Sequence, residues 1–336
     1  MTGSAPVAHE APVPGWLPCS DRSVERDDPL YGTAGYGERW FLVEIDGAWG
    51  AHAFLQSQLD PVLGRRLVTR VEGAGIRPLA IRRTGRTADQ RRGQARWRWA
   101  LVDARVGQES VRWGAVDDPA DLLSVPLDGS SGEPSTDPVI CVCTHARHDQ
   151  CCAVKGRPVV TALAKAHPRA TWECSHVGGD RFAGNLVLFP HGLYYGRVTG
   201  ADAAAIVDAY SHGLIEPRWF RGRCSLPNPV QAAAAFARAD SGDNRINAFE
   251  YLSRTEDQGA HAVTFDHDGA RLTVHLVEAL SAPLLSTCAA VTARPVREFE
   301  LAWLDPPSAA GAAPDAPDSP GDPGSDHPPN GGETRT

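Results

Sequence analysis

Lysine and long apolar runs are scarce in the 336-residue sequence. Lysine occurs only at positions 155 and 165, and the other 31 of the 33 basic residues are arginine, a bias that we attribute to coding rather than to chemistry. No run of about eighteen apolar residues occurs, which excludes an apolar membrane-spanning helix. Residues 1–21 have neither the basic segment nor the apolar core of a secretory signal peptide, so we expect a cytoplasmic protein.

Net positive charge is also lacking. The formal net charge is −8 and the sequence pI is about 5.8, which argues against a nucleic-acid partner. The 42% apolar content is ordinary for a folded protein, and the length is sufficient for two domains. We therefore predict a folded protein that binds neither nucleic acid nor membrane.

The cysteines are distributed unevenly. Four of the eight fall between residues 141 and 152, and the run Cys174-Ser-His176-Val-Gly-Gly-Asp180 follows them. Thiolate and imidazole groups together suit iron–sulfur clusters, zinc or copper rather than magnesium or calcium. In a reducing compartment, clustered cysteines are more typical of metal binding or catalysis than of disulfides. The remaining three stand alone in the sequence, so we predict free thiols in or near the core for Cys19, Cys224 and Cys288.

The apolar pattern alternates between strands and helices. In the second part of the chain it predicts a strand, a helix, three strands and a helix, at residues 138–143, 157–166, 171–174, 186–189, 194–198 and 201–211. The first part is a fainter copy, with a strand at 40–45, a helix at 53–63 and strands at 76–81 and 97–102. We interpret this order as an α/β (α+β) thioredoxin-like fold with two tandem lobes, the first of which is degenerate because it has no cysteine or histidine cluster.

Breaks in composition predict the domain organisation. We expect a disordered N-terminus (1–15), a degenerate thioredoxin-like lobe (16–127), a Gly/Ser/Pro linker (128–137), a thioredoxin-like ferredoxin lobe with the site (138–215), a C-terminal extension (216–304) and a disordered Pro/Gly/Asp-rich tail (305–336). For the extension we predict a helix at 229–239 and strands near 261–266, 271–277 and 296–303.

Two loops should carry the chemistry. Residues 143–152 are expected to connect the first strand of the second lobe to its helix, and residues 174–184 to follow a neighbouring strand at the same end of the sheet. Glycines at 178, 179 and 184 permit the tight backbone that a ligand loop needs. The Cys-x-x-Cys motif of thioredoxin is absent, which disfavours ordinary dithiol exchange.

These residues resemble a known family. The runs Cys143-Thr-His-Ala-Arg-His-Asp-Gln-Cys-Cys152-Ala and Trp172-Glu-Cys-Ser-His176-Val-Gly-Gly-Asp180, together with landmarks such as Pro29-Leu-Tyr-Gly-Thr-Ala34, are similar to the sucrase/ferredoxin-like family. Its members are relatives of thioredoxin-like [2Fe-2S] ferredoxins. The resemblance covers roughly residues 16–303. It implies a [2Fe-2S] cluster as cofactor and an unidentified redox protein as partner.

The resemblance also implies ligands. Cys143 and Cys152 match the two family cysteines, and His176 matches the first histidine of a His-x3-His pattern. Asp180 stands where the second histidine would be, so the fourth ligand is this aspartate, a nearby thiol (Cys174 or Cys151), water or an exogenous ligand. His145 and His148 lie in the same loop, and we expect them to face solvent or support the ligands rather than bind metal.

Three functions follow. The first, which we favour, is a [2Fe-2S] protein for electron transfer or redox sensing, closer to an electron carrier than to an enzyme. The second is a zinc-stabilised binding module, and the third is a thiol-dependent reductase or peroxidase that uses Cys151 or Cys152. No carboxylate pair in the sequence supports a sucrase or other glycosidase activity.

Overall fold

The computed structural model describes residues 17–84 and 96–309, which form a mixed α/β structure with two sheets. The expected disordered N-terminus and nearly all of the expected tail lie outside the described residues. Within the described residues, no helix is long and apolar enough to cross a membrane.

The elements follow one another in three groups. The first comprises α1 (Cys19–Glu25), β1 (Arg39–Glu44), α2 (Pro61–Gly73), β2 (Arg77–Arg82), β3 (Trp97–Asp103), β4 (Ser110–Val116), the 3-10 helix η1 (Pro119–Leu123) and β5 (Glu133–Ser135). The second comprises β6 (Val139–Cys143), α4 (Gln150–Ala166), β7 (Thr171–Cys174), η2 (Asp180–Phe182), β8 (Leu186–Phe189), β9 (Leu193–Tyr195), α5 (Ala203–Ser211), η3 (Pro217–Trp219) and β10 (Phe220–Arg223). The third comprises α6 (Asn228–Ser241), β11 (Glu250–Asp257), β12 (Ala260–His267), β13 (Ala270–Leu280), β14 (Arg297–Leu304) and β15 (Ser308–Ala309).

The first two groups share a ten-stranded sheet of order β10-β9-β8-β6-β7-β2-β1-β3-β4-β5. In each half, the first strand pairs in parallel with the second and antiparallel with the third: β1 with β2 and β3, and β6 with β7 and β8. Among the described residues, strand pairing joins the two halves at the short antiparallel pair of β2 and β7, at Ile81–Cys174 and Arg82–Glu173. The same pairing pattern thus occurs twice along the chain.

The large sheet folds over at this joint. Strands in a sheet lie about 4.8 Å apart, so β1 and β8, four places apart in the sheet order, would be roughly 19 Å apart if the sheet were flat. The rings of Trp40 on β1 and Phe189 on β8 instead have centroids 5.4 Å apart, and Trp113 on β4 stacks at 5.3 Å on Trp172 of β7. The two half-sheets therefore face each other across a shared apolar core.

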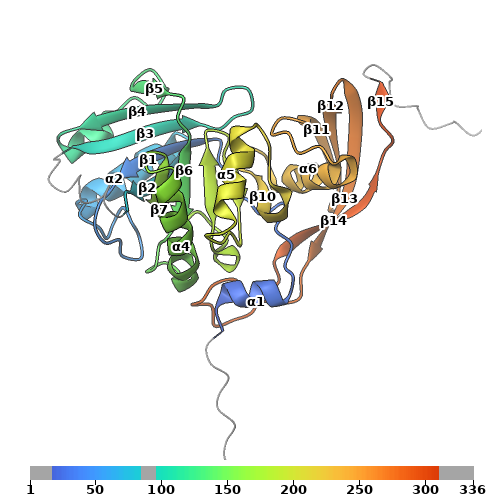
Figure 1. Ribbon diagram of the computed structural model, residues 1–336, viewed down its shortest axis with the longest axis horizontal. Coiled ribbons are helices and arrows are strands. Elements are labelled where there is room, and N and C mark those ends of the chain that lie inside the picture. Colours follow the sequence, from blue (N-terminus) through green and yellow to red (C-terminus); the bar gives the residue numbers. More distant parts are fainter. Residues whose placement is uncertain (1–16, 85–95, 310–336) are drawn as a thin grey trace, which may run out of the picture.

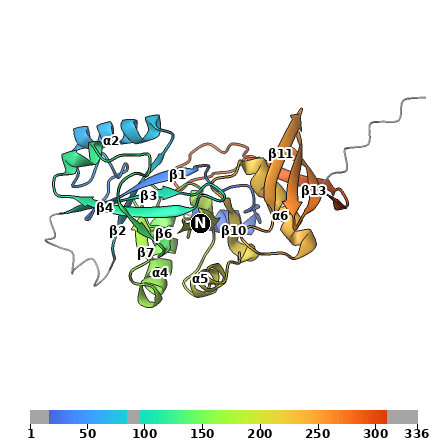
Figure 2. The ribbon, with the colours of Figure 1, turned by 90° about the horizontal axis from the view of Figure 1, so that it is seen from above.

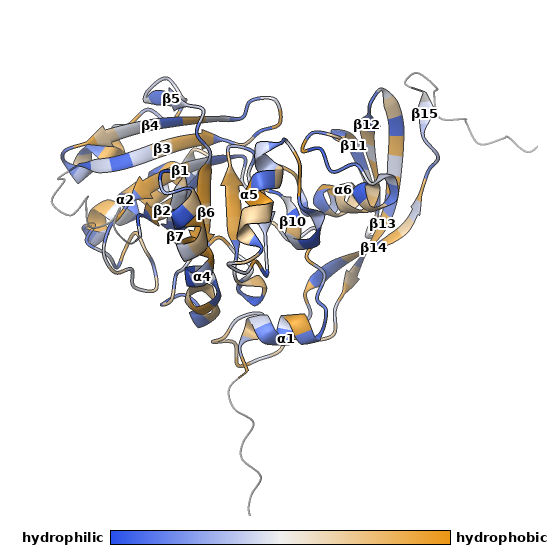
Figure 3. Ribbon diagram, viewed as in Figure 1, coloured by the Kyte–Doolittle hydropathy of each residue, from blue (hydrophilic) through white to orange (hydrophobic). Residues whose placement is uncertain are grey.

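Helices cover the outer faces of the folded sheet. Alternate strand residues point in opposite directions, so Phe41 and Val43 of β1 pack with Leu67 of α2, whereas Ile140 of β6 packs with Leu163 of α4. Figure 2 shows α2 on one side of the strands and α4 with α5 on the other. Figure 3 shows the strand β6 as a hydrophobic segment between more mixed helices, as expected for a strand buried on both faces.

The C-terminal group forms a second, antiparallel sheet of order β11-β12-β13-β14, with β15 paired to β13. Apolar residues of α6, including Val230 and Ala233, pack against Phe265 and Val274 on one face of this sheet. Figure 1 shows this sheet beside the large one, with α1 below both. The expected helix and three strands of this region are confirmed, but the sequence analysis did not predict β11, and Ser308–Ala309 forms a strand inside the expected tail.

Two expected helix starts were wrong for the same reason. The first-lobe helix was predicted at 53–63, but α2 begins at Pro61, where the Asp60 side chain caps the backbone N–H of Leu63. The second was predicted to start at residue 157 because Pro158 suits a first turn. Helix α4 begins instead at Gln150, capped by Asp149, and carries Pro158 in its interior. Capping aspartates decided both starts. The expected linker 128–137 also contains the short strand β5.

Candidate metal centre

The candidate site lies at the carboxyl ends of β6 and β7. These strands are parallel neighbours, and Cys143 and Cys174 are paired in register as their last residues. Cys143 therefore sits beside the loop that leaves β7 and carries His176 and Asp180. Cys152 comes from the first turn of α4 rather than from the preceding loop, because Asp149 starts that helix earlier than expected.

The structure brings three of the expected ligands into one group. The Cys143 and Cys152 sulfurs and a His176 ring nitrogen all lie within 4.8 Å of one another. Asp180 joins them, since its Oδ1 accepts a hydrogen bond from the Cys152 thiol at 3.2 Å and lies 3.0 Å from His176 Nδ1. Both cysteines are fully buried, and Asp180 is 4% exposed. Two thiols, an imidazole and a carboxylate thus converge in a nearly closed interior site.

Gly179 and Arg221 shape the loop between His176 and Asp180. Gly179 has φ +80°, and a β-carbon there would lie 2.4 Å from Arg221 Nη2. The buried Arg221 guanidinium donates to the carbonyl of Gly178 at 3.0 Å and to Asn185 Oδ1 at 2.7 Å. Its Nε donates to Thr33 Oγ1 at 3.1 Å, so it also ties the loop to the segment before β1. A bare glycine is required where the backbone passes over this guanidinium.

Charge interactions in the site stabilise ionised groups. The neighbouring Cys152 thiol and His176 lower the pKa of Cys143 to about 5, against the opposing effect of burial. Burial acts to lower the pKa of His176, but Asp180 and Cys143 outweigh it and raise that pKa to about 9. Burial likewise opposes ionisation of Asp180, yet His176 holds its pKa below the usual value. These pKa shifts favour the ionised forms of all three groups: a thiolate at Cys143, an imidazolium at His176 and a carboxylate at Asp180.

The other two histidines of the loop have different surroundings. His145 is 3% exposed, its Nε2 lies 2.7 Å from the carbonyl of Gly50, and its Nδ1 accepts from the backbone N–H of His176 at 3.3 Å. With both ring nitrogens used, His145 positions His176. The ring of His148 stacks on that of His176 with centroids 3.8 Å apart, and its Nε2 lies 3.9 Å from Asp180 Oδ2. His148 is thus a candidate donor that the sequence analysis did not select.

Neither of the two alternative thiols belongs to the donor group. Cys174 is fully buried in the apolar core between the half-sheets, where it neighbours Cys141. Cys151 faces away from Cys152 and meets Cys19 and Cys288. Both partners are free thiols, as expected, but the sequence analysis did not predict that they meet Cys151. Hydrogen bonding from Cys19 is the largest effect that lowers the pKa of Cys151 to about 5. More than 130 residues separate Cys151 from each partner, so no local pattern could have indicated this contact. Cys224 is buried in the core as a free thiol, as expected.

The site opens to solvent through its histidines. A cavity of about 270 Å³ is lined by residues that include His52, His145, His148 and His176. The side chains of His148 and His176 are 34% and 26% exposed, whereas the thiols behind them are buried. The imidazole edges are therefore the accessible part of the site.

A family model described as "Sucrase/ferredoxin-like" matches residues 30–222, and the chain belongs to this family. The matched range contains the whole candidate site and excludes Cys19 and Cys288. Two curated relatives carry the name "Altered inheritance of mitochondria protein 32". The one from Candida glabrata is 31% identical over 100 residues, covering 25% of this chain and 32% of the relative. The one from Meyerozyma guilliermondii is 34% identical over 98 residues, covering 26% and 35%. The matches thus span about a third of each relative's length. No solved structure matches the chain.

Proposed function

We propose that the protein binds a [2Fe-2S] cluster through Cys143, Cys152, His176 and Asp180 and acts in electron transfer or redox sensing. The observation that carries this proposal is the convergence of two thiols, an imidazole and a carboxylate at the ends of β6 and β7. Membership of a family described as ferredoxin-like supports the same chemistry. When bound, such a cluster would supply a redox couple.

The donor set suits this cofactor chemically. Cysteine thiolates are the usual ligands of iron–sulfur clusters, and imidazoles replace two of them in Rieske centres. His176 Nδ1 is buried and, apart from its ion pair with Asp180, has no hydrogen-bond partner. The lowered pKa values of Cys143 and Asp180 favour the deprotonated forms that bind metal ions.

Two residues of the site, Asp180 and His148, compete for the position of the fourth ligand. We propose Asp180, because it contacts both Cys152 and His176 and is nearly as buried as the thiols. His148 is its competitor, since one donor atom each from His148, His176 and Asp180 also lie within 4.8 Å of one another. If His148 were the fourth ligand, the site would have two histidine ligands, as in the His-x3-His pattern. The second histidine would then come from the loop before α4 rather than from position 180.

Electrons would pass through the histidine edge of the site. The thiols are buried, so the partly exposed rings of His148 and His176 are its nearest approach to solvent. We propose that the redox partner protein docks over the cavity that these rings line. A cytoplasmic location remains a prediction, and the names of the two relatives refer to mitochondrial inheritance.

We also propose that each half of the large sheet is a thioredoxin-like lobe. The support is the repeated order of a strand, a helix, a parallel strand and antiparallel strands, with the helix on the outer face. Among the described residues, thiols and imidazoles occur together after the first strand of the second copy, whereas the equivalent loop of the first copy has the single histidine His52 and no cysteine. The first lobe would then act as a scaffold that buries the inner face of the second.

A zinc-stabilised module is the second candidate. One specific observation favours it: the donors of Cys143, Cys152 and His176 lie close enough to surround a single ion, as in tetrahedral zinc sites. Zinc has no redox role, so the two candidates predict different absorption spectra and different metal contents.

The discriminating experiment is spectroscopy and metal analysis of the full chain purified without oxygen. A [2Fe-2S] protein contains two irons and two sulfides per cluster, absorbs visible light and gives an electron paramagnetic resonance signal after one-electron reduction. A colourless protein whose only metal at this site is one zinc ion would refute the cluster and support the zinc module.

Three variants then identify the fourth ligand. If Asp180 binds iron, Asp180→Ala makes the cluster labile, whereas His148→Ala and Cys174→Ser retain it with an unchanged spectrum. The reverse result, with a stable cluster in Asp180→Ala and loss in His148→Ala, assigns the role to His148. Cys174→Ser is the matched control for a buried thiol beside the site that lies outside the donor group.

A further inference from the structure

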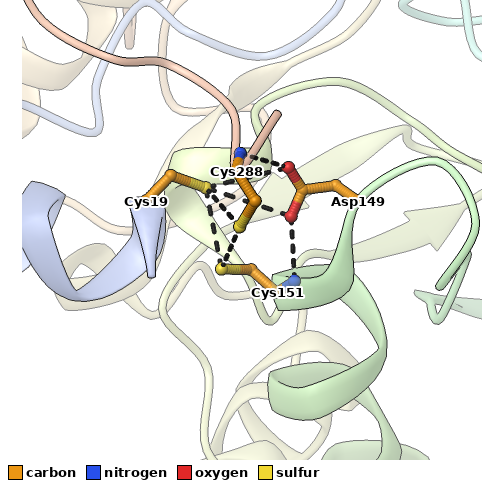
Figure 4. A group of neighbouring side chains, drawn as sticks. All are labelled: Cys19, Asp149, Cys151 and Cys288. Atoms are coloured by element: carbon orange, nitrogen blue, oxygen red, sulfur yellow. Dashed lines mark hydrogen bonds between the residues drawn. The ribbon is translucent and has the colours of Figure 1, made fainter. Parts of the chain in front are cut away.

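A second group of metal-binding side chains lies behind the first turn of α4. Figure 4 shows the thiols of Cys19, Cys151 and Cys288 pointing toward one another beside the carboxylate of Asp149. The Sγ–Sγ distances are 3.6 Å for Cys19–Cys151, 3.0 Å for Cys151–Cys288 and 3.5 Å for Cys19–Cys288. The Asp149 oxygens lie 3.9 and 4.0 Å from the Cys19 sulfur. Cys19, Cys151 and Asp149 are at most 3% exposed.

These residues come from three distant parts of the chain. Cys19 begins α1, Asp149 and Cys151 belong to the start of α4, and Cys288 lies in the connection between β13 and β14. Figure 1 shows α1 beside that connection, below the large sheet. Asp149 is fixed by the backbone N–H groups of Cys151 at 2.8 Å and Cys288 at 2.7 Å, so its carboxylate joins two of the three segments.

We propose that this group is a second metal site, in which Cys19, Cys151, Cys288 and Asp149 bind one zinc ion. Four ligands with three thiolates suit a closed structural zinc site. Zinc–sulfur bonds of about 2.3 Å place tetrahedral ligand sulfurs about 3.8 Å apart, close to two of the three distances here. Binding would release the protons of the thiols that are protonated, and these pass to solvent.

The geometry favours one ion over a disulfide or an ordinary core. A disulfide would join two of the three thiols by a bond of about 2.05 Å and leave the third unused, whereas all three sulfurs lie 3.0–3.6 Å apart, beyond that bond length. Few apolar side chains surround the group: besides the cysteines, the buried apolar cluster here contains only Ala183. Three thiols and a carboxylate, rather than aliphatic side chains, therefore fill the space between α1 and the start of α4.

The zinc site would link the segments on both sides of the family-matched range, residues 30–222, to the first metal centre. Consecutive helical residues are rotated by about 100°, so Cys151 faces this group while Cys152 faces the other. Helix α1, which carries Cys19, also packs against η2, which begins with Asp180. A zinc ion here would clamp the first turn of α4 and thereby hold Cys152 in position.

The test is metal analysis of the full chain, purified under reducing conditions and treated with zinc followed by removal of the excess. We expect one zinc per chain that Cys143→Ser does not remove, because that variant affects only the first site. Cys19→Ser and Cys288→Ser should each lose this zinc and, because the zinc holds Cys152 in position, should also bind the metal of the first site less firmly. Cys224→Ser, which replaces a buried thiol outside both groups, is the matched control and should keep one zinc.

Spectroscopy of the unmutated protein keeps the test independent of folding defects in the variants. X-ray absorption should show zinc bound by three sulfurs at about 2.3 Å and one oxygen. Cobalt(II) in place of zinc should give thiolate charge-transfer and tetrahedral bands. Zinc content unaffected by both Cys19→Ser and Cys288→Ser would overturn the proposal. So would a purified chain that takes up no zinc, or one in which mass analysis finds a Cys151–Cys288 disulfide. These results do not depend on whether the first site holds iron.

Discussion

Replacing Gly179 by alanine should damage the ligand loop more than the same change at Gly178. Both glycines have positive φ, +80° and +94°, so alanine at either position is strained by about 1–2 kcal/mol. The surroundings differ. A β-carbon at 178 has no atom within 4 Å, whereas one at 179 would lie 2.4 to 2.9 Å from three atoms of the Arg221 guanidinium.

The difference between the two variants follows from the contacts of Arg221. The guanidinium is 1% exposed and donates hydrogen bonds to Thr33, Gly178 and Asn185, so it cannot move without breaking at least one of them. Loss of a buried hydrogen bond to a charged group costs about 1.5–3 kcal/mol. We therefore expect Gly178→Ala to lower the free energy of unfolding by about 1–2 kcal/mol and Gly179→Ala by about 2.5–5 kcal/mol.

Chemical denaturation of the two variants beside the unmutated protein measures this difference, and the metal content of each reports the local effect on Asp180. Gly179→Ala should also lose bound metal faster on exposure to a chelator, since Asp180 follows directly. Equal destabilisation by the two substitutions would show that the Arg221 side chain can shift at little cost. The contact between Gly179 and Arg221 would then not determine the conformation of the loop.

Three further predictions concern the same site. In the metal-free protein, the raised pKa of His176 should contribute stability that is complete below about pH 6.5 and is lost as the pH rises through about 9. Unfolding curves across this range should show the decline, and His176→Gln should remove it. A cluster with one imidazole and one carboxylate ligand should have a reduction potential between about −400 mV, as in plant-type ferredoxins, and the Rieske range above about −150 mV. Redox titration measures it, and a value at the all-cysteine end with no pH dependence would argue against a His176 ligand. Cys143→Ser and Cys152→Ser should each deplete the metal at this site, because no other described thiol belongs to its donor group; undiminished metal in either variant would exclude that cysteine.

The sequence alone determined the type of chemistry and much of the local structure. Cys143, Cys152, His176 and Asp180 were selected because two short runs resemble the sucrase/ferredoxin-like family, and the structure brings these four residues together. The buried strand β6 and the strands β12 to β14 were predictable because their apolar patterns are local, and Gly269 marks the tight turn between β12 and β13. Helix starts were less predictable, since a single capping side chain such as Asp60 or Asp149 moved them by seven or eight residues.

Only the tertiary structure decided which thiols meet. Cys151 and Cys152 are adjacent in sequence, yet the turn of α4 directs them to two different groups. Cys19 and Cys288 meet Cys151 because α1 and the β13–β14 connection pack against the start of α4, and these contacts span 132 and 137 residues. No local pattern indicated that the large sheet folds over where β2 pairs with β7. The apolar patterns of these two strands are compatible with several neighbouring strands. Local patterns record which groups a segment offers, whereas long-range packing determines which of those groups share a site.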